Sequence, residues 1–144
     1  MTKDKIQRII IDKIKKAYFR GIVLASVRSG KTRILLTAIR EMSNNEEENI
    51  SILLVYPNTD IKNSWINEMD KLYYFPKITW STFKSLKKYE DNKYDYIIVD
   101  EGHSIPKDNI LPLVSKLAKN NDKIIIASGT YSEDTLLNLK FSTG

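Results

Sequence analysis

Four mainly apolar runs constrain the fold of this chain more than any other feature of its sequence. They cover residues 22–25, 50–56, 94–99 and 123–127, and a further short strand, of more mixed character, is expected over 77–81. Segments of helical character separate them, at residues 4–19, 31–42, 60–73, 82–88 and 106–119. Apolar strands that alternate with helices are typical of a parallel sheet covered on both faces. The sequence therefore predicts a three-layer α/β fold with a ligand crevice at the carboxyl ends of the strands.

The expected helices have definable inner faces and ends. The first places these side chains on or near one face: Ile6, Ile9, Ile10, Ile14 and Ala17. The helix over 31–42 turns the following side chains inward: Ile34, Leu35, Ala38, Ile39 and Met42. Asn58, Thr59 or Asp60 caps the helix over 60–73, and Pro106 falls in the first turn of the helix over 106–119. We expect Gly21 to break the first helix, strand 22–25 to be fully buried, and a further helix to begin beyond Ser132.

Composition excludes several classes of protein. With 144 residues, the chain fits one domain, residues 1–144. It has no cysteine and a single histidine, which excludes a disulfide framework, a thiolate metal site and a histidine-rich metal site. No apolar run approaches the roughly 20 residues that span a bilayer, so we expect a cytoplasmic protein with no membrane partner. The net charge of +5 mildly favours polyanionic partners, although its lysines are scattered and a lysine-rich solvated surface explains it equally well.

The segment Ala25-Ser-Val-Arg-Ser-Gly-Lys-Thr32 lies between the first strand and the second helix. It follows the phosphate-loop pattern of glycine, four residues and Gly-Lys-Ser/Thr, with Ala25 in place of the first glycine. Backbone amides from Ser29 to Thr32, including that of Gly30, can hold the phosphates of ATP, and Lys31 can reach the β- and γ-phosphates. Thr32 can coordinate Mg²⁺. Arg28 either lines the nucleotide entrance and touches phosphate or points into solvent. The alternative, a chance Gly-Lys-Thr turn, is disfavoured by the strand before it and the amphipathic helix after it.

Two adjacent carboxylates follow the strand over 94–99. Asp100 would hold Mg²⁺ directly or through water, and Glu101 would orient and deprotonate the water that attacks the γ-phosphate. Adjacent residues that leave a strand point in different directions, which suits two roles. The alternative is an acidic turn that only caps a helix. Together with the phosphate loop, this pair predicts a site that binds and hydrolyses ATP.

Residues 25–32 together with Asp100-Glu-Gly-His103 resemble the first RecA-like domain of superfamily 2 helicases and translocases of the DExH type. Three further segments extend the resemblance over nearly the whole chain. Residues 56–65, followed by Glu68, resemble motif Ia; residues 78–83 resemble the strand and turn before the acidic motif; Ser128-Gly-Thr130 resembles motif III. The Arg-Ser-Gly-Lys-Thr form of the loop is similar to that of phage-encoded members.

The resemblance implies roles for further residues. His103 would connect the nucleotide site to motif III, where Ser128 and Thr130 would relay the state of the γ-phosphate. Gln7 corresponds to a glutamine that reads adenine, although the aromatic residue and proline that often precede it are missing. The residues along the nucleic-acid track would be Pro57, Asn58, Thr59, Ser81 and Thr82. Each has a plainer alternative, as a surface histidine or as an ordinary strand-end, turn or capping residue. The two tryptophans, Trp65 and Trp80, are expected in the core or at its rim rather than stacked on bases.

The resemblance implies an ATP-dependent helicase or translocase that acts on DNA or RNA, with single-stranded or duplex DNA as the expected partner. Such enzymes need a second RecA-like domain, which residues 1–144 do not contain and which the same or another chain would supply. Alone, the chain is expected to hydrolyse ATP slowly; if phage-encoded, it would work in the host cytoplasm. One alternative is a non-catalytic truncated module that binds nucleic acid or a helicase partner and regulates it. Another is a small P-loop phosphotransferase, against which the sequence lacks an arginine-rich, lid-like insertion after the core strands.

Overall fold

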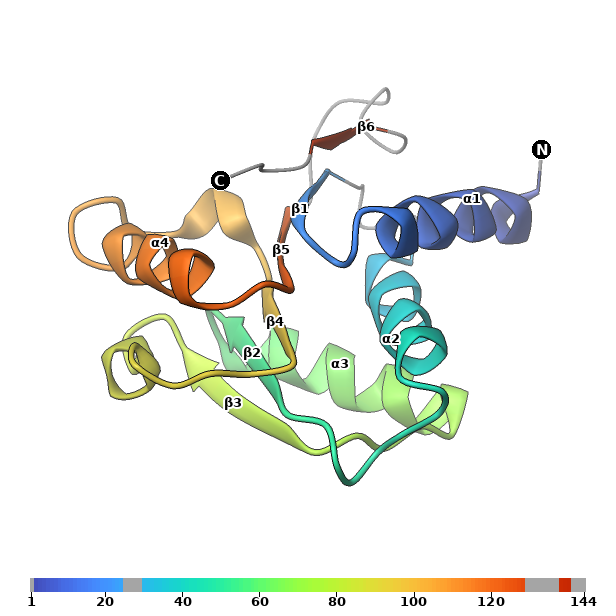
Figure 1. The fold of residues 1–144 in the computed structure, drawn as a ribbon, viewed down its shortest axis with the longest axis horizontal. Helices are drawn as coiled ribbons and strands as arrows, with labels where there is room; N and C mark the ends of the chain where they lie inside the picture. Colours follow the sequence, from blue (N-terminus) through green and yellow to red (C-terminus); the bar gives the residue numbers. More distant parts are fainter. Residues whose placement is uncertain (1, 25–29, 129–137, 141–144) are drawn as a thin grey trace.

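The computed structural model describes residues 2–24, 30–128 and 138–140. Strands and helices alternate along the chain, as the sequence predicts (Figure 1). The elements in chain order are α1 (Lys3–Lys16), β1 (Gly21–Leu24), α2 (Lys31–Met42), β2 (Ile52–Tyr56), α3 (Thr59–Leu72), β3 (Ile78–Thr82), β4 (Tyr96–Val99), α4 (Leu111–Asn120), β5 (Ile124–Ser128) and β6 (Asn138–Lys140). Two short 3₁₀ helices, η2 (Leu86–Tyr89) and η3 (Gly102–Ser104), lie in the loops around β4.

The strands form one six-stranded sheet in the order β3-β2-β4-β5-β1-β6. Strands β1 to β5 run parallel, and β6 pairs antiparallel with β1 at one edge. The predicted parallel α/β fold is therefore confirmed. Strand β5 separates β1 from β4, so the segments that follow β1 and β4 lie at the same edge of the sheet, on either side of the end of β5. This edge is where both predicted nucleotide-binding motifs meet.

The sheet is covered on both faces, which makes three layers (Figure 1). Helices α1, α2 and α3 pack on one face, against the side chains of Ile52, Leu54 and Tyr56 in β2. Helix α4 and η2 pack on the other face, against the alternate residues Leu53 and Val55. Successive residues of a strand point to opposite faces, so burial on both faces explains why β2 has no polar alternation.

Two expectations about burial are wrong. Ile9 is exposed, and Ile11 is buried instead, because the inner face of α1 is rotated relative to the expected one. The strand over 22–25 is not fully buried, since Ile22 is exposed while Val23 belongs to the core. Among the described residues, the layer that contains α4 packs on β2, β4 and β5 and includes no residue of β1, so this layer does not cover Ile22.

Several element ends also differ from the expectations. Helix α1 ends at Lys16, before Gly21, because Tyr18 and Phe19 adopt left-handed backbone angles. Helix α4 begins at Leu111 with Pro112 in its first turn, whereas Pro106 lies in the preceding turn. The short helix expected over 82–88 is the 3₁₀ helix η2. The helix expected beyond Ser132 is wrong for residues 138–140, which form β6 because they can extend the sheet beside β1.

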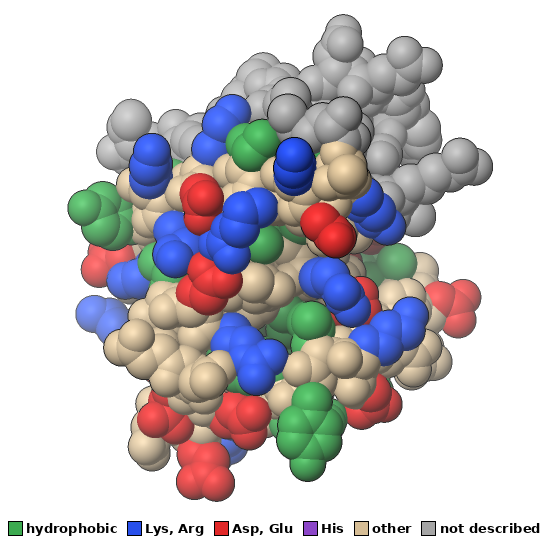
Figure 2. All heavy atoms as spheres, turned by 90° about the vertical axis from the view of Figure 1, so that its right-hand side faces the viewer, with side chains coloured by type: hydrophobic (Ala, Val, Ile, Leu, Met, Phe, Trp, Pro, Cys, Tyr) green, Lys and Arg blue, Asp and Glu red, His purple; other side chains and the backbone are tan. Residues whose placement is uncertain are grey.

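Charged side chains of both signs are interspersed on the face that α1 and α2 form (Figure 2). The positive net charge of the chain is therefore not concentrated on the described part of this face. Among the described helices, none combines the length and apolar character needed to cross a membrane.

Candidate nucleotide-binding site

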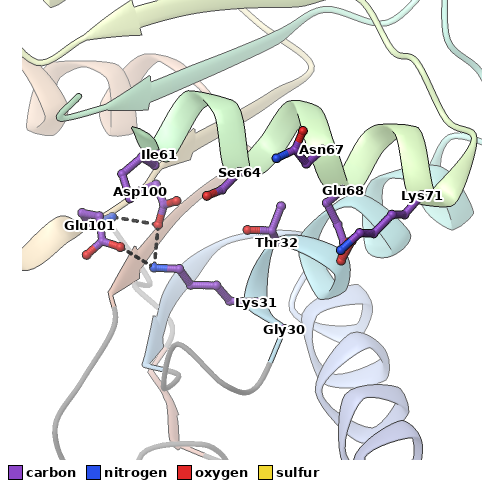
Figure 3. A pocket seen from close by; sticks show the side chains of 10 residues that line it. All are labelled: Gly30, Lys31, Thr32, Ile61, Ser64, Asn67, Glu68, Lys71, Asp100 and Glu101. Atoms are coloured by element: carbon purple, nitrogen blue, oxygen red, sulfur yellow. Dashed lines mark hydrogen bonds and ion pairs between the residues drawn. The ribbon is translucent and has the colours of Figure 1, made fainter. Parts of the chain in front are cut away.

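A cavity of about 330 Å³ lies at the carboxyl edge of the sheet, between the start of α2, the end of β4 and one side of α3 (Figure 3). Its walls bring together residues from both predicted motifs. The lining consists of Gly30, Lys31, Thr32, Ile61, Ser64, Asn67, Glu68, Lys71, Asp100 and Glu101. The parallel topology explains this meeting, because the segments after β1 and β4 leave the sheet at the same end.

Gly30 shapes the start of α2. It has a left-handed backbone, with φ 75° and ψ 43°, and precedes the first helical residue. A Cβ atom at this position would collide with the amide of Gln7. The backbone angles therefore require glycine, whereas the Gln7 amide, at the end of a flexible side chain, could shift. Gly30 itself offers no side chain to cap α2, so the first N–H groups of the helix can serve an anionic ligand, which also gains from the positive end of the helix dipole.

Lys31 forms a buried ion cluster with the two carboxylates that follow β4. Its Nζ lies 2.9 Å from Asp100 Oδ1 and 2.8 Å from Glu101 Oε1. Burial lowers the pKa of Lys31, but attraction to Asp100 and hydrogen bonds to both carboxylates outweigh it, and the net result is a raised pKa. The lysine is therefore charged at neutral pH. One positive and two negative groups leave an excess negative charge beside the cavity.

Asp100 is buried and its two carboxylate oxygens have different partners. Oδ1 accepts hydrogen bonds from Lys31 and from the backbone N–H of Glu101, the latter at 2.8 Å. Oδ2 accepts a hydrogen bond from the indole Nε1 of Trp65, also at 2.8 Å. Trp65 lies in the core, as expected, but its contact with Asp100 has no signal in the sequence, because the two residues are 35 positions apart. Only the fold brings α3 against the end of β4.

Glu101 connects the ion cluster to the end of β5. Its backbone is left-handed, with φ 55° and ψ 48°, which is uncommon for a residue other than glycine. Its Oε2 lies 3.2 Å from His103 Nε2, and His103 Nδ1 lies 2.8 Å from the hydroxyl of Ser128. The structure thus joins Lys31, Glu101, His103 and Ser128 in one chain of polar contacts.

The residues at the cavity fit a magnesium ion. Thr32 and Asp100, the two predicted ligands, both line it and offer a hydroxyl and a carboxylate, which are the hard oxygen donors that Mg²⁺ prefers. Among the described residues, no group of three or more histidine, cysteine, aspartate or glutamate side chains could hold a metal alone. Mg²⁺ commonly takes few protein ligands and completes its shell with water and phosphate oxygens, so this donor set suits a nucleotide-bound ion.

The other predicted site residues have varied positions. Gln7 is buried against Gly30. Asn58 is the N-cap of α3 and accepts a hydrogen bond from the N–H of Ile61 at 3.2 Å. Thr82 likewise accepts from the N–H of Ser85. After β2, Pro57 is partly buried, and Asn58 and Thr59, the N-cap and first residue of α3, are exposed. Arg28, Ser29 and Thr130 lie outside the described residues.

Ser81, which is predicted to lie along a nucleic-acid track, has a buried side chain in this conformation. Its hydroxyl donates a hydrogen bond to the carbonyl oxygen of Thr82 at 2.8 Å. Its place on the track stays a prediction.

Helix α3 supplies cavity residues that the motifs did not identify. Ser64, Asn67 and Lys71 line the cavity, and Glu68 both lines it and pairs with Arg33 on α2 at 3.3 Å. From Ile61 onward, each of these residues lies three or four positions after an earlier member of the set, so they share one side of α3. A polar stripe on a helix that must pack beside the phosphate loop is the signal that would have found them.

A lysine at the start of the helix after β1, together with carboxylates after a strand two places away in the sheet, defines a P-loop nucleotide-binding domain with a RecA-like fold. The family model for thymidine kinase matches residues 21–138, which is most of the chain. The chain therefore belongs to the thymidine kinase family. A comparison with curated proteins finds no significant match.

Several solved structures have the same fold. The chain is similar to the SWI2/SNF2 ATPase core of Sulfolobus solfataricus in complex with double-stranded DNA, with a TM-score of 0.66, 19% identity and 93% of this chain covered. It is also similar to the UvsW helicase from bacteriophage T4, with a TM-score of 0.68, 15% identity and 90% coverage. A third is a nuclease-deletion mutant of the Type ISP restriction-modification enzyme LlaGI in complex with a DNA substrate mimic, with a TM-score of 0.61, 16% identity and 95% coverage.

The chain spans only part of each of these structures, namely 32% of the SWI2/SNF2 core, 52% of UvsW and 18% of the LlaGI mutant. At these identities the likeness concerns the fold. The names of the matches differ in chemistry: the family model is that of thymidine kinase, whereas the solved structures include an ATPase core and a helicase.

Proposed function

We propose that this chain is the ATP-binding half of a DExH-type helicase or translocase, which couples ATP hydrolysis to movement on DNA or RNA. The observation that carries the proposal is the buried cluster of Lys31, Asp100 and Glu101 at the wall of an open cavity. The fold shared with two DNA-bound motor proteins and a phage helicase supports the same class, and DNA is the favoured partner. The protein would act in the cytoplasm, which is the host cytoplasm if a phage encodes it.

Each residue of the cluster has a distinct task in this proposal. The Lys31 ammonium exchanges the carboxylates for the β- and γ-phosphate oxygens when ATP enters. Thr32 and Asp100 hold Mg²⁺, which when bound neutralises charge on the phosphates. Release of Lys31 frees Oε1 of Glu101, which then orients the attacking water and accepts its proton. The carboxylate that holds the lysine before binding is thus the base that acts afterwards.

The contacts of His103 supply a route between ATP and nucleic acid. Glu101, His103 and Ser128 lie in one series of polar contacts from the ion cluster to the end of β5. A change at Glu101 when the γ-phosphate binds or leaves would alter the contact of His103 with Ser128. Asn58, in the loop after β2, and Thr59, the first residue of α3, are exposed at the same edge of the sheet and would hold the nucleic-acid backbone with Thr82.

Full activity would need a second RecA-like domain, in the same or another chain, that places an arginine against the γ-phosphate. In related phosphate-hydrolysing systems such an arginine accelerates the reaction by about 10³–10⁵-fold. The chain alone would therefore bind ATP, hydrolyse it slowly and leave duplexes intact. The proposal of a non-catalytic regulator is weaker, because Lys31 and Glu101 are both retained and lie in contact.

Membership of the thymidine kinase family favours a second candidate, a phosphotransferase that uses thymidine as acceptor. The same cluster would serve, with Glu101 accepting the proton of a thymidine hydroxyl while the γ-phosphoryl group moves to its oxygen and ADP leaves. The polar residues Ser64 and Asn67 on the cavity wall would then contact the acceptor.

One assay separates these candidates. MgATP turnover by the purified chain is measured alone and with single-stranded DNA, duplex DNA, RNA or thymidine, beside Lys31→Ala and Glu101→Gln. Stimulation by a nucleic acid that both variants lose supports a motor, and Lys31-dependent ATP binding with very slow turnover supports half a motor. Production of thymidine monophosphate would establish the kinase instead. A chain that binds no ATP would contradict both candidates.

A further inference from the structure

The indole of Trp65 is fixed at the base of the nucleotide-binding site. Trp65 is fully buried in the core between the sheet and the helices α1, α2 and α3. Its Nε1 donates a hydrogen bond of 2.8 Å to Asp100 Oδ2. An indole N–H can only donate, so this bond specifies which side of the tryptophan ring faces the carboxylate.

The two oxygens of Asp100 are held by groups of different mobility. Oδ1 meets the flexible side chain of Lys31, at 2.9 Å, and the backbone N–H of Glu101. Oδ2 meets a rigid ring that packs in the core. If Lys31 moves to the phosphates, the bond from Trp65 remains and keeps the carboxylate in the same rotamer, with Oδ1 available to a cation.

We propose that Trp65 is a positioning residue, which orients Asp100 and thereby strengthens the binding of magnesium-bound nucleotide. This inference rests on the proposed function, because it assumes that Asp100 serves Mg²⁺ and ATP. Hydrogen-bond partners that orient a metal ligand commonly change metal affinity or activity by about 10–100-fold when they are removed. A core residue that only filled space would have no effect on the magnesium dependence.

The decisive variant is Trp65→Phe, which keeps an aromatic ring and removes the N–H. Its matched control is Tyr74→Phe. Tyr74 is also fully buried, and its hydroxyl donates a hydrogen bond of 2.9 Å to the carbonyl of Glu46, away from the cavity. Both variants lose buried hydrogen bonding, and Trp65→Phe also loses part of the ring volume, but only Trp65→Phe loses a contact to Asp100.

The measurement is the binding of a fluorescent ATP analogue during a Mg²⁺ titration, repeated with EDTA. For Trp65→Phe we expect the half-saturating Mg²⁺ concentration to rise by about tenfold or more. In the presence of EDTA, its affinity for the nucleotide analogue should stay within about twofold of that of wild type. Tyr74→Phe should follow wild type in both conditions. An unchanged Mg²⁺ dependence in Trp65→Phe, with wild type binding normally, overturns the inference alone. A wild-type chain that binds no nucleotide overturns the proposed function.

A second measurement applies even if Trp65→Phe does not fold. The chain has two tryptophans, so its ¹H–¹⁵N spectrum contains two indole signals, and a Trp80→Phe variant identifies that of Trp65. Saturating Mg²⁺ and nucleotide should shift the Trp65 signal more than nucleotide with EDTA does. An identical Trp65 signal in both conditions would refute the role in magnesium binding.

Discussion

Two clusters of charged side chains in this protein have similar geometry and different surroundings. At the cavity, Lys31 lies 2.9 Å from Asp100 and 2.8 Å from Glu101, and these side chains are 9%, 2% and 17% exposed. Between α1 and α2, Arg8 lies 2.8 Å from Asp12 and 2.6 Å from Glu41, with exposures of 46%, 54% and 31%. Distance alone therefore does not distinguish an ion pair in a site from one that joins two helices.

Burial separates the two clusters energetically. Exposed ion pairs contribute about 0.2–1 kcal/mol each, because water and salt screen them. A buried ion costs several kcal/mol to remove from water, and its partners only offset that cost. The exposed cluster of Arg8, Asp12 and Glu41, called the outer cluster below, suits the packing of α1 on α2. The buried cluster of Lys31, Asp100 and Glu101, called the inner cluster, costs free energy to remove from water, so stability alone does not explain it. It is also the cluster that faces a cavity.

The largest expected effect comes from Lys31→Met, which removes the positive charge and retains the length of the side chain. Two carboxylates would then lie buried without a cation, so we expect a loss of about 3–5 kcal/mol in the free energy of unfolding. Binding of MgATP should also be lost. Urea denaturation and nucleotide titration measure the two effects.

The control for this change is Lys15→Met, because Lys15 pairs with Glu41 at 3.0 Å in the outer cluster and is 39% exposed. Its loss should cost less than about 1 kcal/mol and leave nucleotide binding unchanged. Equal losses of stability in the two variants would remove the distinction between the clusters.

A smaller effect is expected from the backbone of Glu101. Glu101→Gly and Glu101→Ala both remove the carboxylate, but only glycine adopts φ 55° without strain. The glycine variant should therefore be more stable than the alanine variant by about 1–2 kcal/mol, and both should lack ATP hydrolysis. Thermal unfolding of the pair gives the difference.

Tyr73 provides a matched test outside the site, since it is left-handed at φ 50° and caps the end of α3. Tyr73→Gly should exceed Tyr73→Ala in stability by a similar amount, without any change in nucleotide binding. Equal stability of the two Glu101 variants would contradict the interpretation that the backbone of Glu101 is strained.

The sequence predicted the parts of the fold that follow from local patterns. The apolar runs identified β2, β4 and β5, and helical periodicity identified α2 and α3 within one or two residues. The phosphate loop and the acidic pair were found because their spacing is fixed by local chain geometry. The meeting of Lys31 with Asp100 followed from the general rule that parallel strands end at one edge of the sheet.

Contacts between distant elements were harder to predict. The bond from Trp65 to Asp100 depends on how α3 is rotated against the sheet, and no spacing in the chain records that rotation. The burial of Ser81 depends on its neighbours across the sheet in the same way. The exposure of Ile22 reflects how far the layer of α4 extends, which is a property of the assembled fold.

The smallest expected effect is the pH dependence of stability that Glu41 contributes in the outer cluster. Hydrogen bonds from Arg8, together with Lys15, lower the pKa of Glu41 from 4.5 to about 2. A carboxyl group whose pKa is lowered by folding stabilises the protein above its unfolded pKa, and that contribution is lost as the pH falls toward the folded pKa. We therefore expect Glu41→Gln to lose about 0.5–1 kcal/mol at about pH 7, with the difference from wild type shrinking steadily between about pH 4.5 and pH 2.

Thermal unfolding of both proteins across this range measures the difference, with Glu48→Gln, an exposed carboxylate outside the cluster, as the control. That control should match wild type throughout. A deficit in Glu41→Gln that stayed constant down to about pH 3 would mean that Glu41 acts through packing rather than through its charge. High salt should likewise reduce the Glu41 effect, because exposed ions are screened, and should leave most of the Lys31 effect in place, because that cluster is buried. The two clusters would then differ in their response to salt as they do in their exposure to water.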